Sequence, residues 1–555
     1  MESIRPAPQI QVKLNGQPLD ARALADLSSF TVEHGSGLIS KFTLVLRTRH
    51  PGTREYTWVD NPLFKPGGML EIAMGSGGSV PTPLISGDIT DLELRAEADG
   101  PPVLEVSGLD PRYVLAREHK TRRFKEKTLA ALVRKIVEPQ GFKLGNVPTA
   151  EAAPVTQYNQ TDLEFLNALA RDHGCELSLS IQGRQKTLHL LKRDVGASSR
   201  LTLGEELLEF NPRLSSQSLV RKVTVRSASR SGEEELVESV SLQVTQKRVG
   251  LLADEREVKG HRTIINRPVN SPGQARALAQ AELERIVSTA VTGSGLCLGN
   301  PLLRVGGTLS ILGLGKRFSG DYHLTQVTHT FSVEQGFRTA FEVQGGPRVP
   351  DSVSEPRAVA QGLAVARVNQ IDAQGRVTLL FPWLAPDYVS DWVRVASPMA
   401  GKGRGLYLPL QVDDEVLVAF EQGDIDRPFV LGAVWNASAS PPDLQQGSAS
   451  GSSDAEKRQY AFRSPGGLAL WFDDKARRIV LGDGEKNQLI IDAREGSVSL
   501  KVAGDLALEG KGTLNLKCGV LSAHARQRGS LQADLGLALK SNAGIQLNDG
   551  ALEVM

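Results

Sequence analysis

Two groups of adjacent acidic residues are the first candidates for catalytic chemistry in this sequence: Asp413-Asp414-Glu415 and Asp473-Asp474. Hydrolysis of a glycosidic bond needs two carboxyl groups that flank the bond from opposite sides. Adjacent residues of an extended chain point to opposite faces, so neither group favours a converging pair. We therefore predict turn or surface roles for Asp414, Glu415, Asp473 and Asp474, and we expect no catalytic residue and no enzyme.

Two glycine-rich segments superficially resemble phosphate-binding loops: Gly313-Leu-Gly315 with Gly320, and Gly401-Lys-Gly403-Arg-Gly405. Neither has the spacing of a P-loop or of a GxGxxG turn between a strand and a helix, so we predict simple β-turns. The nine histidines form no HxH or HExxH pattern, and the three cysteines form no CxxC pair. The sequence therefore predicts neither a cofactor nor a metal site.

The charges nearly cancel, because 64 Lys+Arg residues stand against 63 Asp+Glu residues. Proteins that bind nucleic acid usually carry a basic excess, so we expect no nucleic-acid partner. No apolar run approaches the ~20 residues that cross a bilayer. The first residues lack the apolar stretch of a signal peptide, so we expect assembly in the cytoplasm without one.

The sequence of residues 1–355 predicts a mixed α+β domain dominated by strands. Short alternating runs such as 42–46 and 223–225 are typical of half-buried strands. Apolar spacing predicts a helix over 129–137 that stops before a proline. Thr161 and Glu164 form the capping box of a second helix, and Ser271-Pro272 opens a third.

Residues 356–440 predict a compact all-β unit. Five short strands separated by Gly and Asp turns are typical of a small barrel; they are expected at 363–368, 376–381, 392–397, 415–420 and 429–434. Residues 441–458 are rich in Ser, Gly, Pro and Gln and predict a flexible linker.

Residues 459–555 have a composition that an ordinary globular core cannot use. After Phe472 there is no aromatic residue and no proline, yet eleven glycines occur between 473 and 555. Apolar residues alternate at a period of two, and glycines recur near every eighth residue, which indicates a β-solenoid. Three chains wound around one axis would bury these stripes and remove exposed strand edges; a single-chain β-helix or a flat sheet remains the alternative. The residues expected at the trimer core and tip are Leu535, Leu537, Leu539, Ile545, Leu547, Leu552 and Val554.

The order of motifs in residues 375–432 resembles the OB-fold domain of contractile-tail spike proteins, which are the phage baseplate spike and VgrG-type proteins. The motif residues, to which we assign structural roles in turns and strands, are Trp392, Arg394, Asp414, Glu415, Gly423, Asp424, Arg427 and Pro428.

The preceding residues are similar to the late-control-protein-type hub domain of the same family. The similarity rests on residues 157–162, 302–307 and 313–322, although Gln160 and Gly306 stand where an acid and a proline are expected. The tail resembles the family's triple-stranded β-helix, entered through residues 464–474. The N-terminal region is most similar to spikes of extracellular contractile injection particles.

The resemblance implies a fold that is mainly β with some α: a hub with duplicated β-barrels, an OB-fold barrel and a C-terminal triple-stranded intertwined β-helix. It implies a structural homotrimer that connects an inner tube and baseplate proteins to a PAAR-type tip protein at its C-terminus. Such a spike transmits contraction force to puncture a target envelope, as part of a phage tail-like particle that is extracellular after release. Only linker residues stand where some phage spikes insert a lysozyme domain, and we expect no effector domain after the tail, so the resemblance implies a nonenzymatic spike.

Two other functions remain as alternatives. One is a spike that also degrades an envelope polymer, which would need a pair of converging acids or a metal cluster. The other is a barrel that binds a glycan or an oligonucleotide, because OB folds permit both. The aromatic residues in or near the barrel are Phe381, Trp383, Tyr388, Trp392 and Tyr407.

Overall fold

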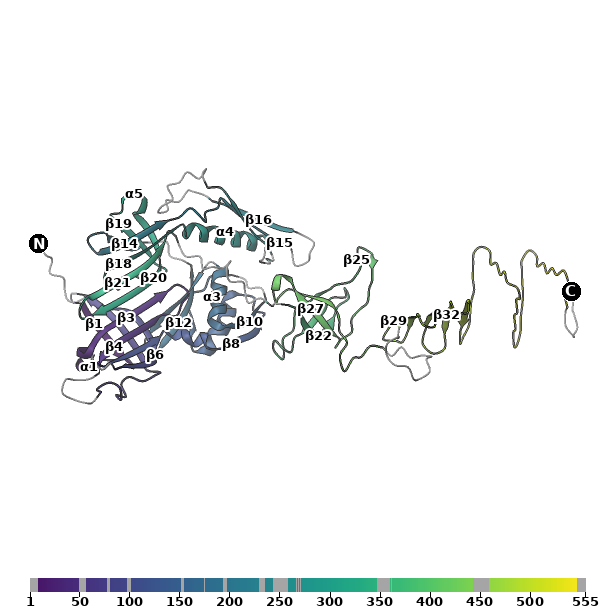
Figure 1. Cartoon of the computed structure of the whole chain (residues 1–555), viewed down its shortest axis with the longest axis horizontal. Coiled ribbons are helices and arrows are strands. Elements are labelled where there is room, and N and C mark those ends of the chain that lie inside the picture. Colours follow the sequence, from purple (N-terminus) through teal and green to yellow (C-terminus); the bar gives the residue numbers. More distant parts are fainter. Residues whose placement is uncertain are drawn as a thin grey trace. The chain divides into compact units, whose positions relative to one another are not determined.

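The computed structural model contains two compact units, Met1–Ala439 and Ser440–Met555, which are described separately. It describes residues 8–48, 56–76, 80–96, 101–150, 154–173, 175–192, 197–228, 235–242, 258–265, 267, 269, 271–346, 360, 362–442 and 459–546. The first unit comprises the predicted hub and barrel (Figure 1).

The first unit begins with a β module closed around its own apolar core. Alternating residues of its strands are buried, among them Phe30, Val32, Phe42 and Leu44. The elements of the module are β1 (Pro8–Leu14), β2 (Gln17–Pro18), α1 (Ala21–Asp26), β3 (Leu27–Gly35), β4 (Lys41–Arg47), β5 (Met69–Ser76), β6 (Thr82–Arg95) and β7 (Val103–Leu109).

A second β module has a separate core around Leu309, Leu324 and Phe341. Its elements are β13 (Ala197–Thr202), β14 (Leu207–Leu214), β18 (Val291–Leu298), β19 (Thr308–Leu312), the one-turn helix α5 (Gly315–Phe318), β20 (Gly320–Ser332) and β21 (Gly336–Gln344). Antiparallel pairing of β3 with β20 joins both modules into one 13-stranded sheet. The two modules match the β-barrel-rich fold expected for the hub, but α5 replaces the simple turn predicted near Gly315.

A helical segment interrupts the sheet between β7 and β13. It comprises η1 (Pro111–Ala116), β8 (His119–Phe124), α2 (Leu129–Val137), η2 (Glu138–Gln140), β9 (Lys143–Leu144), β10 (Val155–Thr161), α3 (Asp162–Asp172), β11 (Cys175–Gln182) and β12 (Gln185–Lys192). The predicted helix over 129–137 is confirmed. The predicted capping box of α3 is also confirmed, since Thr161 accepts from the Glu164 amide while the Glu164 carboxylate accepts from the Thr161 amide.

A smaller α/β insertion lies between β14 and β18. The three-stranded sheet of β15 (Lys222–Ala228), β16 (Glu235–Ser241) and β17 (His261–Ile264) packs on α4 (Pro272–Ser288). Helix α4 begins as predicted, because the Ser271 hydroxyl accepts from the Gln274 amide and Pro272 occupies the first turn.

The barrel contains the five predicted strands, with shifted ends and a much shorter third strand. They are β22 (Ala364–Ile371), β23 (Val377–Leu380), β24 (Arg394–Val395), β27 (Glu415–Phe420) and β28 (Pro428–Ala433). A hairpin of β25 (Ala400–Gly401) and β26 (Arg404–Gly405) and the 3-10 turn η4 (Glu421–Gly423) complete it. The predicted turn in the second glycine segment is confirmed at this hairpin, where Gly403 has a φ of 69°.

The second unit contains an antiparallel meander of β29 (Gln459–Arg463), β30 (Ala469–Asp473), β31 (Arg478–Gly482), β32 (Gln488–Asp492) and β33 (Ser497–Lys501). The alternation further along predicts strands, but the structure assigns none within the described residues 502–546. An extended segment becomes a strand only when another strand pairs with its N–H and C=O groups. In the predicted β-helix that strand belongs to another chain, so the intertwined helix stays a prediction.

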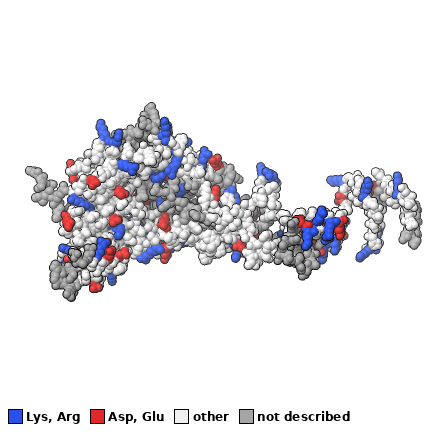
Figure 2. Space-filling view, in the orientation of Figure 1, with Lys and Arg blue, Asp and Glu red and all other residues white. Residues whose placement is uncertain are grey.

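Charged residues of both signs are interspersed on the visible surface (Figure 2). This distribution agrees with the nearly zero net charge of the sequence. In the part of the chain that the structure describes, every helix is too short or too polar to cross a membrane.

Two histidines lie side by side where the β modules meet. His34 on β3 and His329 on β20 have ring centroids 6.0 Å apart, and His329 is 1% exposed. Burial lowers the pKa of His34 to about 4, with Asp110 opposing and Arg112 and Arg304 adding to the shift. Burial and the neighbouring His34 lower the pKa of His329 to about 3.

We expect the first unit to lose stability as the pH falls from 6.5 toward 4. Over this range the unfolded chain binds protons at both histidines while the folded chain leaves them neutral. The free energy of unfolding should fall by at most about 1.4 kcal/mol per pH unit for each histidine. Chemical denaturation of wild type and His329→Gln at several pH values measures the difference in slope, and equal slopes would contradict the prediction.

Candidate functional site

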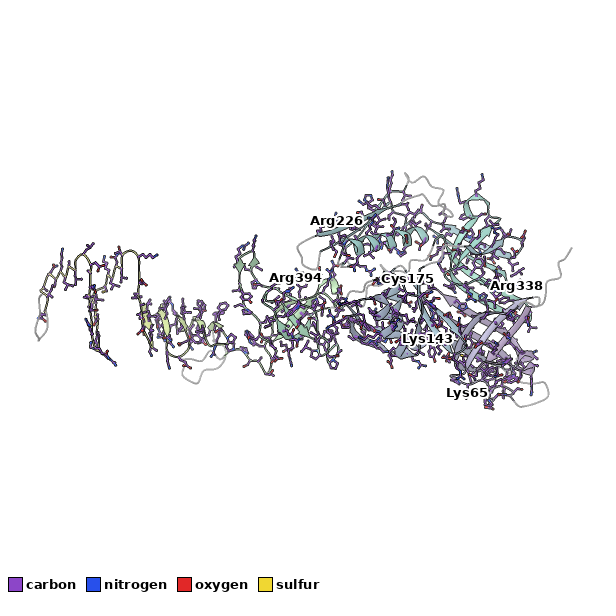
Figure 3. All side chains as sticks on the ribbon, turned by 180° about the vertical axis from the view of Figure 1, so that it is seen from behind. Lys65, Lys143, Cys175, Arg226, Arg338 and Arg394 are labelled. Carbon is purple, nitrogen blue, oxygen red and sulfur yellow. The ribbon has the colours of Figure 1, made fainter. Side chains whose placement is uncertain are left out.

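The motif residues that the sequence singles out in the barrel include two near its surface. Arg394 on β24 lies with its guanidinium 4.6 Å from the centroid of Phe429 (Figure 3). Trp392 is 42% exposed and lies 6.0 Å from the guanidinium of Arg376. These two cation–π contacts hold aromatic rings against arginine side chains on the outer surface of the barrel.

The acidic residues considered as catalytic candidates accept hydrogen bonds in turns and between strands. Asp414 accepts from the Gln411 amide at 2.7 Å, and Glu415 accepts from the side chain of Asn436. Asp473 accepts from the Ala476 amide at 2.8 Å and from Gln459 at 2.9 Å, and the first of these bonds is the main cause of its lowered pKa. These contacts agree with the turn and surface roles expected for the three acids, and the assignment stays a prediction.

Four motif residues form one tight turn, residues 421–428, which we call the junction turn. Gly423 has a φ of 78°, a conformation that favours glycine. Asp424 accepts from the Asp426 amide at 3.0 Å, and its carbonyl accepts from the Arg427 amide at 2.9 Å. Pro428 then begins β28.

The junction turn holds the barrel against the start of β10 in the hub. The Asp426 carboxylate accepts from both the amide of Thr156, at 3.0 Å, and its hydroxyl, at 2.7 Å. The same hydroxyl lies 2.9 Å from the phenol oxygen of Tyr388. Thr156 is buried, so these bonds are shielded from water.

The junction turn also contacts the insertion between β14 and β18. Arg427 donates to the carbonyl of Val269 at 2.8 Å, and Gln422 donates to the carbonyl of Ile265 at 2.7 Å. Arg427 is 6% exposed and also pairs with Glu421 at 3.2 Å. One turn of eight residues therefore binds two separate parts of the hub.

A second contact lies beside the first. Arg123 on β8 pairs with Asp391 of the barrel at 2.6 Å and donates to the carbonyl of Val389 at 3.3 Å. Its guanidinium lies 5.8 Å from the centroid of Tyr388. Planar stacking and a fixed fork of donors suit arginine to such a buried contact.

Burial raises the pKa of Asp426, and Thr156 and Arg123 oppose this shift. Burial likewise raises the pKa of Tyr388. Removal of one hydrogen-bond partner at this contact would leave a buried polar group unsatisfied, which makes the contact specific to its geometry.

The sequence indicated structural roles for Gly423, Asp424, Arg427 and Pro428, which lie in the junction turn, but it did not indicate Asp426, Thr156, Arg123 or Asp391. One signal for Asp426 was available in the sequence. The turn needs only Asp424 to accept a backbone amide of its own, which leaves the second acid, Asp426, for another partner. Thr156 and Asp426 are separated by 270 residues in the sequence. No local sequence pattern connects residues so far apart.

The tail residues predicted for the trimer core are exposed in the single chain where the structure describes them. The fractions are 104% for Leu535, 57% for Leu537, 61% for Leu539 and 52% for Ile545. Leu547, Leu552 and Val554 lie outside the described residues. The assignment of these seven residues to a trimer core and tip stays a prediction.

The aromatic residues of the barrel divide into two groups. Phe381 and Tyr388 are buried in the barrel core, whereas Trp383, Trp392 and Tyr407 are exposed. Among the residues that the structure describes, no group of three or more His, Cys, Asp or Glu side chains is arranged to hold a metal ion.

We expect Thr156 and Asp426 to be energetically coupled. In a double-mutant cycle of Thr156→Val and Asp426→Asn, the coupling energy should be about 0.5–3 kcal/mol, because the two side chains share buried hydrogen bonds. Thermal or chemical unfolding of the full chain measures it. Asp387→Asn, an exposed change in the same barrel, is the control and should couple to Thr156→Val by nearly zero; equal coupling in both cycles would contradict this role of the junction turn.

Two family models match the chain. Residues 361–435 match the type VI secretion system/phage-baseplate injector OB domain, which covers the barrel and its junction turn. Residues 6–333 match the Alg8 N-terminal domain, which covers the first β module, the helical segment, the insertion and the second β module up to the end of β20.

Curated relatives include spike proteins. The type VI secretion system spike protein VgrG4b of Pseudomonas aeruginosa is 25% identical over 389 residues, covering 59% of this chain and 46% of that protein. The actin cross-linking toxin VgrG1 of Vibrio cholerae is 22% identical over 363 residues, covering 59% of this chain and 33% of that protein. The chain thus spans less than half the length of these two relatives.

A solved structure agrees in fold. A chain of the lidded Francisella PdpA–VgrG complex is 10% identical with a TM-score of 0.56, covering 90% of this chain and 81% of that one. At this identity the likeness is one of fold, and the family match over residues 6–333 spans more than half of the sequence. The chain is a homologue of VgrG-type spike proteins and belongs to the Alg8 N-terminal domain family.

Proposed function

We propose that this chain is the structural central spike and hub of a contractile injection machine. As a homotrimer it would connect the inner tube and baseplate proteins to a piercing tip, and transmit contraction force into a target envelope. A PAAR-type protein is the proposed tip. Assembly in the cytoplasm and action in a released phage tail-like particle belong to the same proposal.

The exposed apolar residues of the second unit are the observation that carries this proposal. In the segments of alternating polarity, many leucines each have more than half of the side chain exposed. They include Leu508, Leu514, Leu516, Leu535, Leu537 and Leu539. A protein that works as a monomer rarely exposes so long an apolar row. Winding three copies around one axis would bury these leucines and pair the free backbone groups of the same segments.

The first unit supplies what a hub needs to pass a load from tube to needle. Its two β modules share one hydrogen-bonded sheet, and the junction turn bonds the barrel to two parts of that hub. Cooperative backbone ladders resist local opening, so a force applied at the hub would reach the barrel without loss of structure.

Substitution in the tail tests the trimer. Leu537→Asp should lower the thermal midpoint of the trimer and raise the monomer fraction, because three carboxylates would be buried near one axis at a cost of several kcal/mol. Light scattering and thermal unfolding of the full chain measure both effects. Ala538→Asp changes the neighbouring residue on the opposite face and should leave the trimer intact; a monomeric wild type or equal effects of both changes would contradict the proposal.

The proposed spike is nonenzymatic: Asp414, Glu415 and Asp473 accept hydrogen bonds within the fold, and Asp474 lies exposed at the surface. Purified protein should release no soluble fragments from peptidoglycan. A fourfold variant, in which the three Asp become Asn and the Glu becomes Gln, should have a lower thermal stability and still release no fragments. Fragment release is measured by chromatography, with lysozyme as the positive control. Release by wild type that the fourfold variant loses would establish an enzyme.

A further inference from the structure

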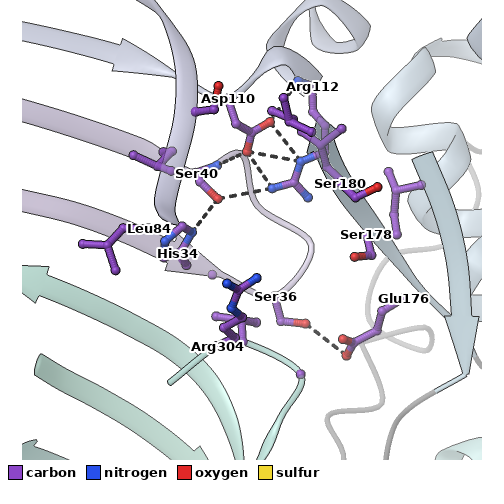
Figure 4. A pocket seen from close by; sticks show the side chains of 18 of the residues that line it. His34, Ser36, Ser40, Leu84, Asp110, Arg112, Glu176, Ser178, Ser180 and Arg304 are labelled. Atoms are coloured by element: carbon purple, nitrogen blue, oxygen red, sulfur yellow. Dashed lines mark hydrogen bonds and ion pairs between the residues drawn. The ribbon is translucent and has the colours of Figure 1, made fainter. Parts of the chain in front are cut away.

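A pocket of about 520 Å³ lies in the hub between three parts of the chain. Its walls come from the first β module at His34, from β11 at Glu176–Ile181, and from the loop Pro301–Gly306 that precedes β19 (Figure 4). The volume falls within the range of ligand pockets, roughly 300–1,000 Å³. A ligand here would contact both β modules and the helical segment between them.

The wall formed by β11 is the edge of a sheet. In the described part of the chain, β11 pairs with β12 along all eight of its residues, and no strand lies on its other side. Six consecutive residues of β11 line the pocket. In an antiparallel pair, alternate residues direct their N–H and C=O groups away from the partner strand, so this edge presents backbone donors and acceptors.

The wall opposite β11 contains the start of β6. Residues Pro83–Ser86 line the pocket, and all but Leu84, where the register shifts, pair with β5; pairing with β7 starts only at Asp88. The hydroxyl of Ser86 is buried and has no hydrogen-bond partner among the described residues. The pocket therefore lies between β11 and the start of β6. Where they line the pocket, each of these strands is paired on one side only.

The middle of β11, beyond the charged Glu176, does not protect its edge. Residues 177–181 read Leu-Ser-Leu-Ser-Ile, without the lysine, proline or bulge that natural edge strands use against pairing. Leu177 packs into the core of the helical segment, and Ser178 and Ser180 border the pocket (Figure 4). A regular, unprotected edge that faces a pocket is suited to accept one more strand.

The charges around the pocket indicate the kind of strand. Arg112 is matched by Asp110 at 2.7 Å and also donates to the carbonyl of Leu38. Arg304 donates only weakly, to the carbonyl of Pro83 at 3.4 Å, and forms no ion pair with any carboxylate in the described part of the chain. Glu176 accepts from Ser36 at 3.3 Å. An incoming carboxylate would therefore find its counter-charge at Arg304.

We propose that this pocket receives an extended acidic peptide segment from another protein of the injection machine. The segment adds to the free edge of β11 as a strand and places a carboxylate against Arg304. Backbone hydrogen bonds supply the affinity, and the arginine together with the serine-lined wall supplies the specificity. This inference rests on the proposed function, since the machine supplies the partner.

Hydrogen exchange on assembled particles tests the site. Co-sedimentation of the chain with particles is measured first, and its failure would count against the proposed function. In particles that contain the chain, amide exchange in Cys175–Gln182 should slow by about tenfold or more relative to the free trimer. Exchange in β16, another edge strand, should change far less; unchanged exchange in β11, or equal slowing in both strands, would overturn the proposal.

Two variants and a cross-link identify the occupant. Arg304→Glu should remove the protection of β11, and Arg304→Lys should retain part of it. Arg317→Glu, an exposed arginine of α5 outside the pocket, is the matched control and should retain all of it. A photoreactive benzoylphenylalanine in place of Ser180 should cross-link to an acidic segment of a different protein. Cross-links to a second copy of this chain, or protection that survives Arg304→Glu, would overturn the proposal.

Discussion

Pairing between β3 and β20 is the interaction on which the rest of the first unit depends. Seven residue pairs, from Gln326 with Gly35 to Ser332 with Ser29, join two modules that each have a core of their own. Because the pairing is antiparallel and in register, it sets His34 beside His329 and directs the turn after β3 toward β11. The side-by-side position of the two histidines, which also line the pocket, follows from this ladder.

The junction turn solves a different problem, which is to attach a barrel that has its own core. An apolar interface alone would leave the orientation of the barrel weakly specified, because hydrophobic contact is non-directional. Hydrogen bonds from Thr156 to Asp426 and from Arg427 to Val269 add direction, since each needs particular atoms at particular angles. Their burial makes a wrong orientation costly, because it would leave the same groups unsatisfied.

The parts of this fold that could be predicted from sequence are those set by local chemistry. Thr161 with Glu164 and Ser271 with Pro272 fixed two helix starts, because capping involves residues a few positions apart. The barrel strands were found for a similar reason, since Gly and Asp turns separate them. Arg123 with Asp391 and Thr156 with Asp426 could not be found, because their proximity results from the folding of the whole unit. At the glycine segment after β19, a one-turn helix formed in place of the predicted turn, since a GxG spacing alone does not select between them.

In the second unit, strands predicted from the sequence do not all form in the structure of a single chain. Its alternating residues have the period of strands, yet the described residues 502–546 form none and leave their leucines exposed. A strand is stabilised only jointly with the strand beside it, so a sequence can specify strands that one chain is unable to complete. The meander β29–β33 is the contrasting case, because short turns let the chain supply its own neighbours. The described segments are therefore paired within the chain up to Lys501 and unpaired after it, which agrees with the proposal that other copies complete the later strands.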